Sequence, residues 1–230
     1  MKNHRSYIQV SNSNIRIIMC YKVKAPENQT ELELEMNAKF VDPTLFEPGR
    51  YLFGFDYPKV AIITDDAPNE IVFGTWGLIP AWAATKDRKE FFKKANTLNA
   101  KIEEVYDKAS YKSYVDNRCL ILVDSFIEYK HVPEVGTKKV DKVPYTINVP
   151  DKKPFAIAGL YSQIGDEITF TLLTTAANTL MAEIHNSAKR MPVILKKQEQ
   201  GLWLEREQLE PYHSRTEIEL EALPISKDLI

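Results

Sequence analysis

The stretches PYTINV (144–149), PFAIAGLYSQI (154–164) and EITFTLLTT (167–175) decide the fold that we expect for this chain. Each is rich in β-branched and aromatic residues and is bounded by turn-forming residues, which is typical of a β-strand. The apolar run CLILVDSFIEYKH (119–131) predicts one further long strand. The centre of the molecule is therefore expected to be built from β-strands.

The segments on either side add shorter strands and several helices. Further strands are predicted at 15–24, 50–55, 59–64, from 71, at 192–195 and within 214–230. Helical patterns occur at 27–40, 86–94, 101–115, 176–184 and 196–206, and the polar segment 132–143 predicts a hairpin or loop. Because strands and helices mix without βαβ regularity, we expect one α+β domain with a predominantly β core.

The composition limits the classes of function. The 230 residues carry 30 Lys and Arg against 32 Asp and Glu, so the net charge of −2 argues against indiscriminate polyanion binding but allows a local basic groove. Two cysteines without metal-ligand spacing indicate a reducing compartment, with no structural metal and no cofactor. Residues 1–18 lack the pattern of a secretory signal, and no apolar run approaches the ~20 residues of a membrane span. A cytoplasmic protein that does not act on membranes is expected.

Four polar residues stand where the apolar pattern stops, and each allows a structural and a chemical interpretation. They are Cys20, Asn99, Glu128 and His185. In the structural interpretation, Cys20 is a small buried side chain and Asn99 caps a helix. Glu128 is then an outward residue of a strand, and His185 forms hydrogen bonds at the end of a helix. Spacing alone favours the structural interpretation for each.

Aromatic and basic side chains leave a similar choice open. Trp76, Pro80 and Trp82 are either core residues or stacking surfaces for bases. Lys22, Lys101, Lys189 and Arg190 are either solvated charges or phosphate contacts.

Seven segments, taken in order, resemble the SRAP (SOS response-associated peptidase) family. They are Met19-Cys20, WGLIPAW (76–82), LNAKIEEV (98–105), RCLILVDSFIEYK (118–130), PFAIAGLYS (154–162), LLTTAAN (172–178) and IHNSAKRMPVIL (184–195). The resemblance implies a single compact α+β domain with a β-rich, barrel-like core, peripheral helices and a positively charged groove. It also implies covalent capture of abasic sites in single-stranded DNA by a monomer, which would be nucleoid-associated when bound to DNA.

The resemblance also assigns roles to residues. Cys20 matches the nucleophile after the initiator Met, Asn99 the Asn of the N-A-R-x-E motif, Glu128 the Glu of D-G-F-x-E-W, and His185 the His before R-M-P. Lys22 and Lys101 stand where the family has Arg, Thr174 and Tyr129 match positions near the site, and Trp76, Pro80 and Trp82 would support flanking bases. No metal or cofactor is implied.

Three departures from the family pattern bear on these roles. Tyr21-Lys22 replaces Gly-Arg, and Phe55-Asp56-Tyr57-Pro58 stands in place of Y-N-x-A-P. Two extra residues between His185 and Arg190 leave open whether Lys189 or Arg190 matches the family's Arg.

The N-terminal segment decides whether the chemistry is available. A 1,2-aminothiol condenses with an aldehyde to a thiazolidine, but Cys20 preceded by residues 1–18 and Met19 carries an amide in place of an amine. We expect residues 1–18 to be an extension outside the mature protein, residues 19–230 to form the single domain, and Met19 to initiate and be removed. Self-cleavage before Cys20 is the alternative.

Two other functions remain open. A cysteine hydrolase or peptidase would use the Cys20 thiolate with His185 as base. A non-catalytic reader of single-stranded or modified DNA would bind through the loop 76–82. Lyase activity by β-elimination is a side reaction expected of the covalent mechanism.

Overall fold

The computed structural model describes residues 20–134 and 136–230. The expected extension 1–18 and the first part of the strand expected over 15–24 lie outside these residues. The remainder of that strand is β1 (Lys22–Lys24).

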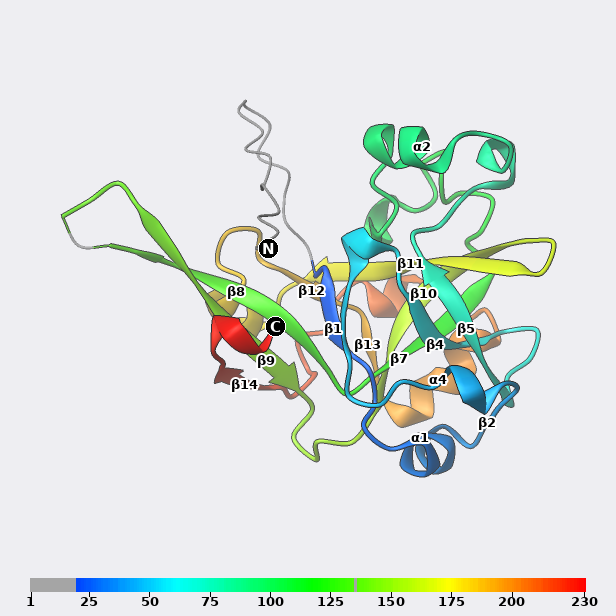
Figure 1. Ribbon diagram of the computed structural model, residues 1–230, viewed down its shortest axis with the longest axis horizontal. Helices are drawn as coiled ribbons and strands as arrows, with labels where there is room; N and C mark the ends of the chain where they lie inside the picture. The colour runs from blue at the N-terminus through cyan, green and yellow to red at the C-terminus, as the bar shows by residue number, and fades with distance from the viewer. Residues whose placement is uncertain (1–19, 135) are drawn as a thin grey trace, which may run out of the picture.

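A ring of five paired strands forms the centre of the described structure (Figure 1). The strands are β4 (Lys59–Thr64), β5 (Glu70–Trp76), β7 (Arg118–Val123), β10 (Phe155–Ile164) and β11 (Glu167–Ala176). The pairs β5–β4, β4–β7, β7–β10 and β10–β11 are all antiparallel. Four reversals return the chain direction to that of β5, so the closing pair β11–β5 is parallel, with Phe170 opposite Trp76.

The carboxyl-terminal half of β11 gathers segments that are distant in sequence. β6 (Asn99–Lys101) pairs with it in parallel, and β12 (Arg190–Pro192) pairs with it antiparallel. β2 (Lys39–Phe40) joins β5, and β13 (Ile194–Leu195) joins β10. Polar residues at the ends of β6 and β12 are thereby brought to one end of the barrel.

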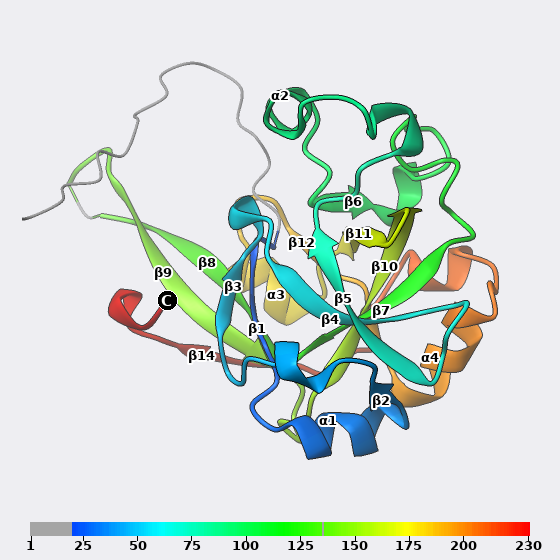
Figure 2. The same ribbon diagram turned by 45° about the vertical axis from the view of Figure 1, so that its right-hand side comes forward.

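A second sheet packs beside the barrel in the order β14-β9-β8-β1-β3. Its other strands are β3 (Tyr51–Phe53), β8 (Ser125–Pro133), β9 (Val140–Asn148) and β14 (Glu221–Pro224). The β8–β9 hairpin projects away from the barrel as a long arm (Figures 1 and 2). The hairpin expected over 132–143 is thus confirmed.

The single long strand expected over 119–131 is wrong, because the chain leaves the barrel at Asp124. The N–H of Asp124 donates to the carbonyl of Lys24 (3.0 Å), and its carboxylate accepts from the N–H of Glu27 (2.9 Å). These contacts bend the backbone between β7 and β8, so the two halves of one apolar run belong to different sheets.

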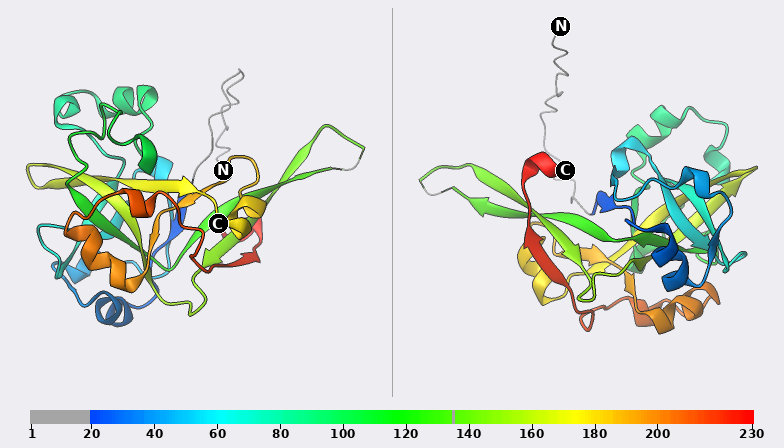
Figure 3. Two further views of the ribbon diagram at one scale, coloured as in Figure 1. Left: turned by 180° about the vertical axis from the view of Figure 1, so that it is seen from behind. Right: turned by 60° about the horizontal axis from the view of Figure 1, so that its bottom comes forward.

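The helices lie on the periphery, as Figures 2 and 3 show. They are α1 (Gln29–Met36), α2 (Arg88–Lys94), α3 (Thr179–Ile184) and α4 (Lys197–Leu204). Short 3₁₀ turns are η1 (Pro43–Leu45), η2 (Gly54–Asp56), η3 (Ala81–Ala83), η4 (Ile102–Glu104), η5 (Glu210–Tyr212) and η6 (Lys227–Leu229). The expected α+β class, with a barrel-like β core and peripheral helices, is confirmed. In the described ranges no helix is long and apolar enough to cross a membrane.

The helix expected over 101–115 is wrong. Pairing with β11 holds the chain extended as far as Lys101, and only the η4 turn follows. Of the residues at helical spacing, Ile102 and Val105 are buried, whereas Tyr106 and Ala109 are exposed. The predicted apolar face is therefore only half buried, in keeping with the absence of a helix over these residues.

Alternate strand residues divide the core into two layers. Ile63, Leu120 and Leu122 belong to the layer that includes Leu32 of α1 and Trp203 of α4. The other set, which includes Ile62, Ile121 and Phe170, packs with Cys20, Phe126 of the second sheet and Met181 of α3. Cys20 therefore lies in the layer shared by the barrel and the second sheet.

The barrel is tightly packed around Gly159 of β10. A Cβ at this position would lie 2.8 Å from Cys119 Sγ and 3.0 Å from the Thr171 carbonyl oxygen, closer than a side chain can be accommodated without backbone shifts. We predict that Gly159→Ala lowers the free energy of unfolding by about 1–3 kcal/mol, measured by urea denaturation.

The matched control is Gly201→Ala in α4, where nothing lies within 4 Å of the added Cβ. Alanine is the better helix former, so this variant should be unchanged or stabilised by up to about 1 kcal/mol. Equal stabilities for the two variants would contradict the packing described for β10.

Candidate functional site

The structure brings the four predicted catalytic residues together in a buried position. Cys20 lies two residues before β1, Asn99 begins β6, Glu128 lies in β8, and His185 caps the C-terminus of α3. Each is at most 4% exposed. Asn99 Nδ2 donates to the Cys20 carbonyl at 2.9 Å, and His185 Nδ1 lies 3.8 Å from Glu128 Oε1.

Glu128 is a buried carboxyl group with an unsatisfied oxygen. It lies on the same face of β8 as Phe126, which packs against the barrel, and this phase was left open by the sequence. Its Oε1 has no hydrogen-bond partner among the described residues. Burial raises the pKa of Glu128 to about 8, against the lowering effect of a backbone hydrogen bond from Tyr129. The side chain is therefore a protonated acid at neutral pH.

His185 is held in one tautomer. Its Nδ1 lies 2.8 Å from the Arg190 carbonyl oxygen, which can only accept, so Nδ1 carries the proton. In the neutral ring Nε2 is then the acceptor, and this atom is buried without a partner in the part of the chain that the structure describes. His185 therefore offers a hydrogen-bond acceptor at Nε2.

Cys20 is a neutral thiol in this environment. Burial raises the pKa of the thiol well above its usual value, and the negative charge that Glu128 acquires above its own pKa of about 8 raises it further. Its Sγ lies 3.8 Å from the Lys22 carbonyl oxygen, to which it donates. A preformed thiolate–imidazolium pair, which lowers the pKa of a catalytic cysteine, is not what this geometry provides.

A cavity of about 400 Å³ opens beside Glu128 and His185. Lys22 and Tyr129, both predicted DNA contacts, line it. Residues that sequence reasoning missed complete the lining and include Tyr21, Phe53, Phe55, His131 and Lys142. The closely spaced phenylalanines at 53 and 55 were the available signal, but in a short strand such residues usually belong to the core. We call this cavity the site pocket.

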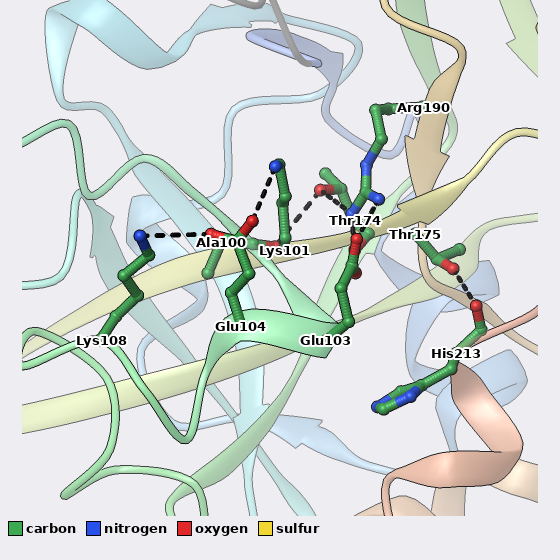
Figure 4. Close-up of polar contacts among 9 residues, drawn as sticks. All are labelled: Ala100, Lys101, Glu103, Glu104, Lys108, Thr174, Thr175, Arg190 and His213. Carbon is green, nitrogen blue, oxygen red and sulfur yellow. Dashed lines mark hydrogen bonds and ion pairs between the residues drawn. The ribbon is translucent and has the colours of Figure 1, made fainter.

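Figure 4 shows the predicted phosphate contacts at the end of β11 engaged with carboxylates. Arg190 forms a bidentate pair with Glu103, and its Nη2 donates to the Thr174 carbonyl at 2.7 Å. Lys101 Nζ lies 2.7 Å from Glu104. The charges of both cations are thus offset by the acidic residues of η4.

The two extra residues after His185 also have a visible consequence. Lys189 is exposed, with a left-handed φ of 51°, and its N–H donates to the His185 carbonyl at 2.8 Å. The Arg190 side chain turns back to β11, where Thr174 Oγ1 donates to the Ala100 carbonyl at 3.3 Å. Arg190 is therefore the one that contacts Thr174.

The predicted aromatic loop divides between core and surface. Trp76 is buried, and its Nε1 donates to the Leu98 carbonyl at 2.7 Å. Pro80 is also buried. Trp82 is 53% exposed, with the Lys86 ammonium 4.7 Å from its ring centroid. Of the three, only Trp82 presents a ring to solvent, and Trp76 acts as a core residue.

Cysteine and metal-ligand geometry complete the description. Cys20 and Cys119 are unpaired and buried. Within residues 20–134 and 136–230, no three His, Cys, Asp or Glu side chains are grouped so that they could hold a metal ion.

Comparisons with known proteins converge on one family. The sequence model described as SOS response associated peptidase (SRAP) matches residues 19–229. The chain is 37% identical over 158 residues to the "Abasic site processing protein YoqW" of Bacillus subtilis (strain 168), a match that covers 66% of this chain and 65% of YoqW. It is 35% identical over the same length to YoaM, which bears the same description, and covers 64% of it. The matches thus span less than two thirds of these relatives.

A solved structure is similar over most of its length. A crystallised protein from Bacteroides thetaiotaomicron superposes with a TM-score of 0.74 at 27% identity, covering 91% of this chain and 93% of that one.

The buried acid predicts a pH-dependent stability. The folded pKa of Glu128, about 8, lies above the ordinary 4.5, so the folded state keeps a proton that the unfolded chain has lost. The stabilisation is complete below pH 4.5 and is lost as pH rises towards 8. We predict that Glu128→Gln removes this contribution of about 1.4 kcal/mol per pH unit, measured by urea denaturation across that range.

Glu70→Gln, an exposed change on β5, serves as control and should keep the wild-type slope. An unchanged pH dependence in Glu128→Gln would show that the carboxyl is ionised in the folded protein.

Proposed function

This chain belongs to the SRAP family, and from that premise we propose that it captures abasic sites in single-stranded DNA covalently, through the amine and thiol of Cys20. The descriptions of its relatives as abasic site processing proteins point to the same substrate. The observation that carries the proposal is the buried group of Cys20, Asn99, Glu128 and His185 beside the site pocket.

The chemistry follows from the ring-opened abasic sugar, which exposes an aldehyde. The α-amine of Cys20 adds to the aldehyde carbon to give a carbinolamine, and loss of water leaves a Schiff base. The Sγ–H bond then breaks as sulfur bonds to the imine carbon, and its proton passes to nitrogen. The product is a thiazolidine, and no oxidant or reductant is needed.

Each neighbour has a role that fits its environment. Glu128, held protonated by burial, donates the proton that expels water, regains one when the neutral Schiff base forms, and relays the Sγ proton to nitrogen at ring closure. His185, with Nε2 free to accept, assists opening of the sugar ring or reversal of the crosslink. Asn99 fixes the main chain of Cys20 through its carbonyl and so orients the amine. The same Schiff base acidifies the adjacent C–H, which makes β-elimination a side reaction.

The mechanism requires Cys20 to be the first residue of the working protein. We propose that residues 1–18 are not part of it, that Met19 initiates and is removed, and that 19–230 form the single domain. The family match, which begins at residue 19, supports this division. The working protein would be a cytoplasmic monomer without cofactor.

A cysteine hydrolase is the weaker alternative. It needs a thiolate at neutral pH, whereas burial raises the pKa of the Cys20 thiol. The His185 ring is oriented by the Arg190 carbonyl, which contacts Nδ1, and not by a carboxylate as in a typical catalytic triad.

Crosslinking tests the proposal directly. A chain that starts at Met19, incubated with single-stranded DNA bearing one abasic site, should form a heat-stable adduct seen by denaturing electrophoresis. Cys20→Ala should abolish it, because neither the thiol nor the ring closure remains. Intact mass should show loss of Met19 and addition of the DNA less one water.

Cys119→Ala is the matched control, since this second buried thiol lies in β7 of the barrel. It should crosslink like the wild type. An adduct of equal yield and heat stability in Cys20→Ala would disprove the proposal, and peptide hydrolysis that needs no free amine would favour the hydrolase.

The acid role of Glu128 has a kinetic signature. Glu128→Gln should slow crosslinking by about 100-fold or more, the usual contribution of a general acid or base. Because the pKa of Glu128 is about 8, the wild-type rate should lose its acid contribution above that pH, and the variant should lack this loss. Rates are measured by quenched time courses over pH.

Glu183→Gln, an exposed change in α3, should leave the rate and its pH profile unaltered. A Glu128→Gln profile parallel to that of the wild type would assign the proton transfers to another group.

A further inference from the structure

Lys22 is a partly buried lysine in the wall of the site pocket. It lies in β1, which pairs with β3 on one side and with β8 on the other (Figure 2). The pairing sets Lys22 opposite Phe53, and Lys22 lines the site pocket together with Glu128 and His185. A primary amine therefore belongs to the same cavity as the carboxyl group and the imidazole of the candidate site.

The Lys22 ammonium group is not held by a carboxylate. Among the described residues Lys22 forms no ion pair, and its Nζ lies 5.5 Å from the centroid of the Phe53 ring. Burial lowers the pKa of Lys22 below its ordinary value, and the negative charge of Asp56 only partly opposes this effect. A lysine in such surroundings loses its proton more readily, and the neutral amine is the nucleophilic form.

Lys24, two residues further along β1, is in the opposite situation. It pairs with Glu27 and does not line the site pocket. Although burial lowers the pKa of Lys24, the hydrogen bond and the charge of Glu27 raise it overall. Residues two apart in a strand share one face, so the difference between the two lysines comes from the pocket and from the carboxylate.

We propose that Lys22 is a second amine nucleophile of the site, which forms a Schiff base with the abasic aldehyde and cleaves the DNA strand by β-elimination. This inference rests on the proposed function for the identity of the aldehyde. It does not require Cys20 to be the first residue, because the reacting nitrogen is Nζ of Lys22. A guanidinium, which the family pattern has at this position, stays protonated and cannot take this step.

The reaction needs no oxidant or reductant. The Nζ lone pair bonds to the aldehyde carbon to give a carbinolamine, and a proton from Glu128, the acid of the same pocket, expels water and leaves a Schiff base. The neighbouring carbon then loses a proton to water, and its electrons form a carbon–carbon double bond. The C–O bond to the 3′ phosphate breaks, and the phosphate leaves with the electron pair. Water finally hydrolyses the Schiff base, which frees the Lys22 amine and an unsaturated aldehyde on the cleaved strand.

Borohydride trapping tests this proposal. Sodium borohydride reduces a Schiff base to a stable secondary amine and so joins the DNA to the nitrogen that attacked it. The 230-residue chain, in which the Cys20 nitrogen is an amide, is incubated with single-stranded DNA bearing one abasic site. We expect strand scission without borohydride, and with borohydride an adduct that tandem mass spectrometry locates on Lys22.

Lys22→Arg keeps the positive charge and removes the reactive amine, so it should reduce trapping and scission to the level of DNA without protein. The matched control is Lys24→Arg, the same change in the same strand but outside the site pocket, which should leave both yields unaltered. Trapping that persists in Lys22→Arg, or that is located on Lys142 of the pocket lining, would overturn the proposal.

A second protein separates this inference from the Cys20 chemistry. It starts at Met19 and carries Cys20→Ala, so no thiazolidine can close, but the α-amine of residue 20 and Nζ of Lys22 can each form a Schiff base. Fragment masses distinguish these two nitrogens. If neither protein is trapped on Lys22, this proposal is wrong and the thiazolidine mechanism is unaffected. If the unsubstituted Met19 chain forms no heat-stable adduct, the Cys20 mechanism is rejected, whatever is trapped on Lys22.

Discussion

The parallel pairing of β11 with β5 is the constraint on which the rest of the structure depends. Four antiparallel steps around the barrel leave this pair as the one that can close the ring, and Phe170 opposite Trp76 fixes its register. Closure removes free edges from the ring, but β11 continues past β5. Its exposed end is then available to pair with β6 and β12, and so Asn99 and the segment after His185 meet there.

The candidate site contains several buried polar atoms between the closed barrel and the second sheet. Asn99 Oδ1, Glu128 Oε1 and His185 Nε2 are each buried and lack a hydrogen-bond partner within the described part of the chain. Unsatisfied buried polar atoms cost stability, and native proteins keep few of them. Three in one place, one on a carboxyl group whose pKa is raised to about 8, mark this position as a candidate functional site.

Charge is also organised by the fold. Arg190 and Lys101 look alike in sequence to Lys89 and Lys93, yet the first two are paired with Glu103 and Glu104 while the last two face a groove without acids. The paired arginine also orders the backbone around it, because its Nη2 donates to the Thr174 carbonyl. Whether a cation is paired thus depends on the fold and not on its residue type.

Local sequence pattern determined the strands 59–64, 155–164 and 167–176, the helices at 179–184 and 197–204, and the hairpin, because apolar periodicity and turn residues act over a few positions. Resemblance supplied the four site residue types. The sequence pattern predicted the wrong element in two places. At Asp124 a hydrogen bond to Lys24 ends the strand, and over 101–115 pairing with β11 keeps the first residue extended. Only the tertiary structure decided that Glu128 and Trp76 are buried and that Phe55 lines the site pocket. The reason is that periodicity encodes which face of a segment is apolar, whereas the partner of that face is chosen among segments tens of residues away.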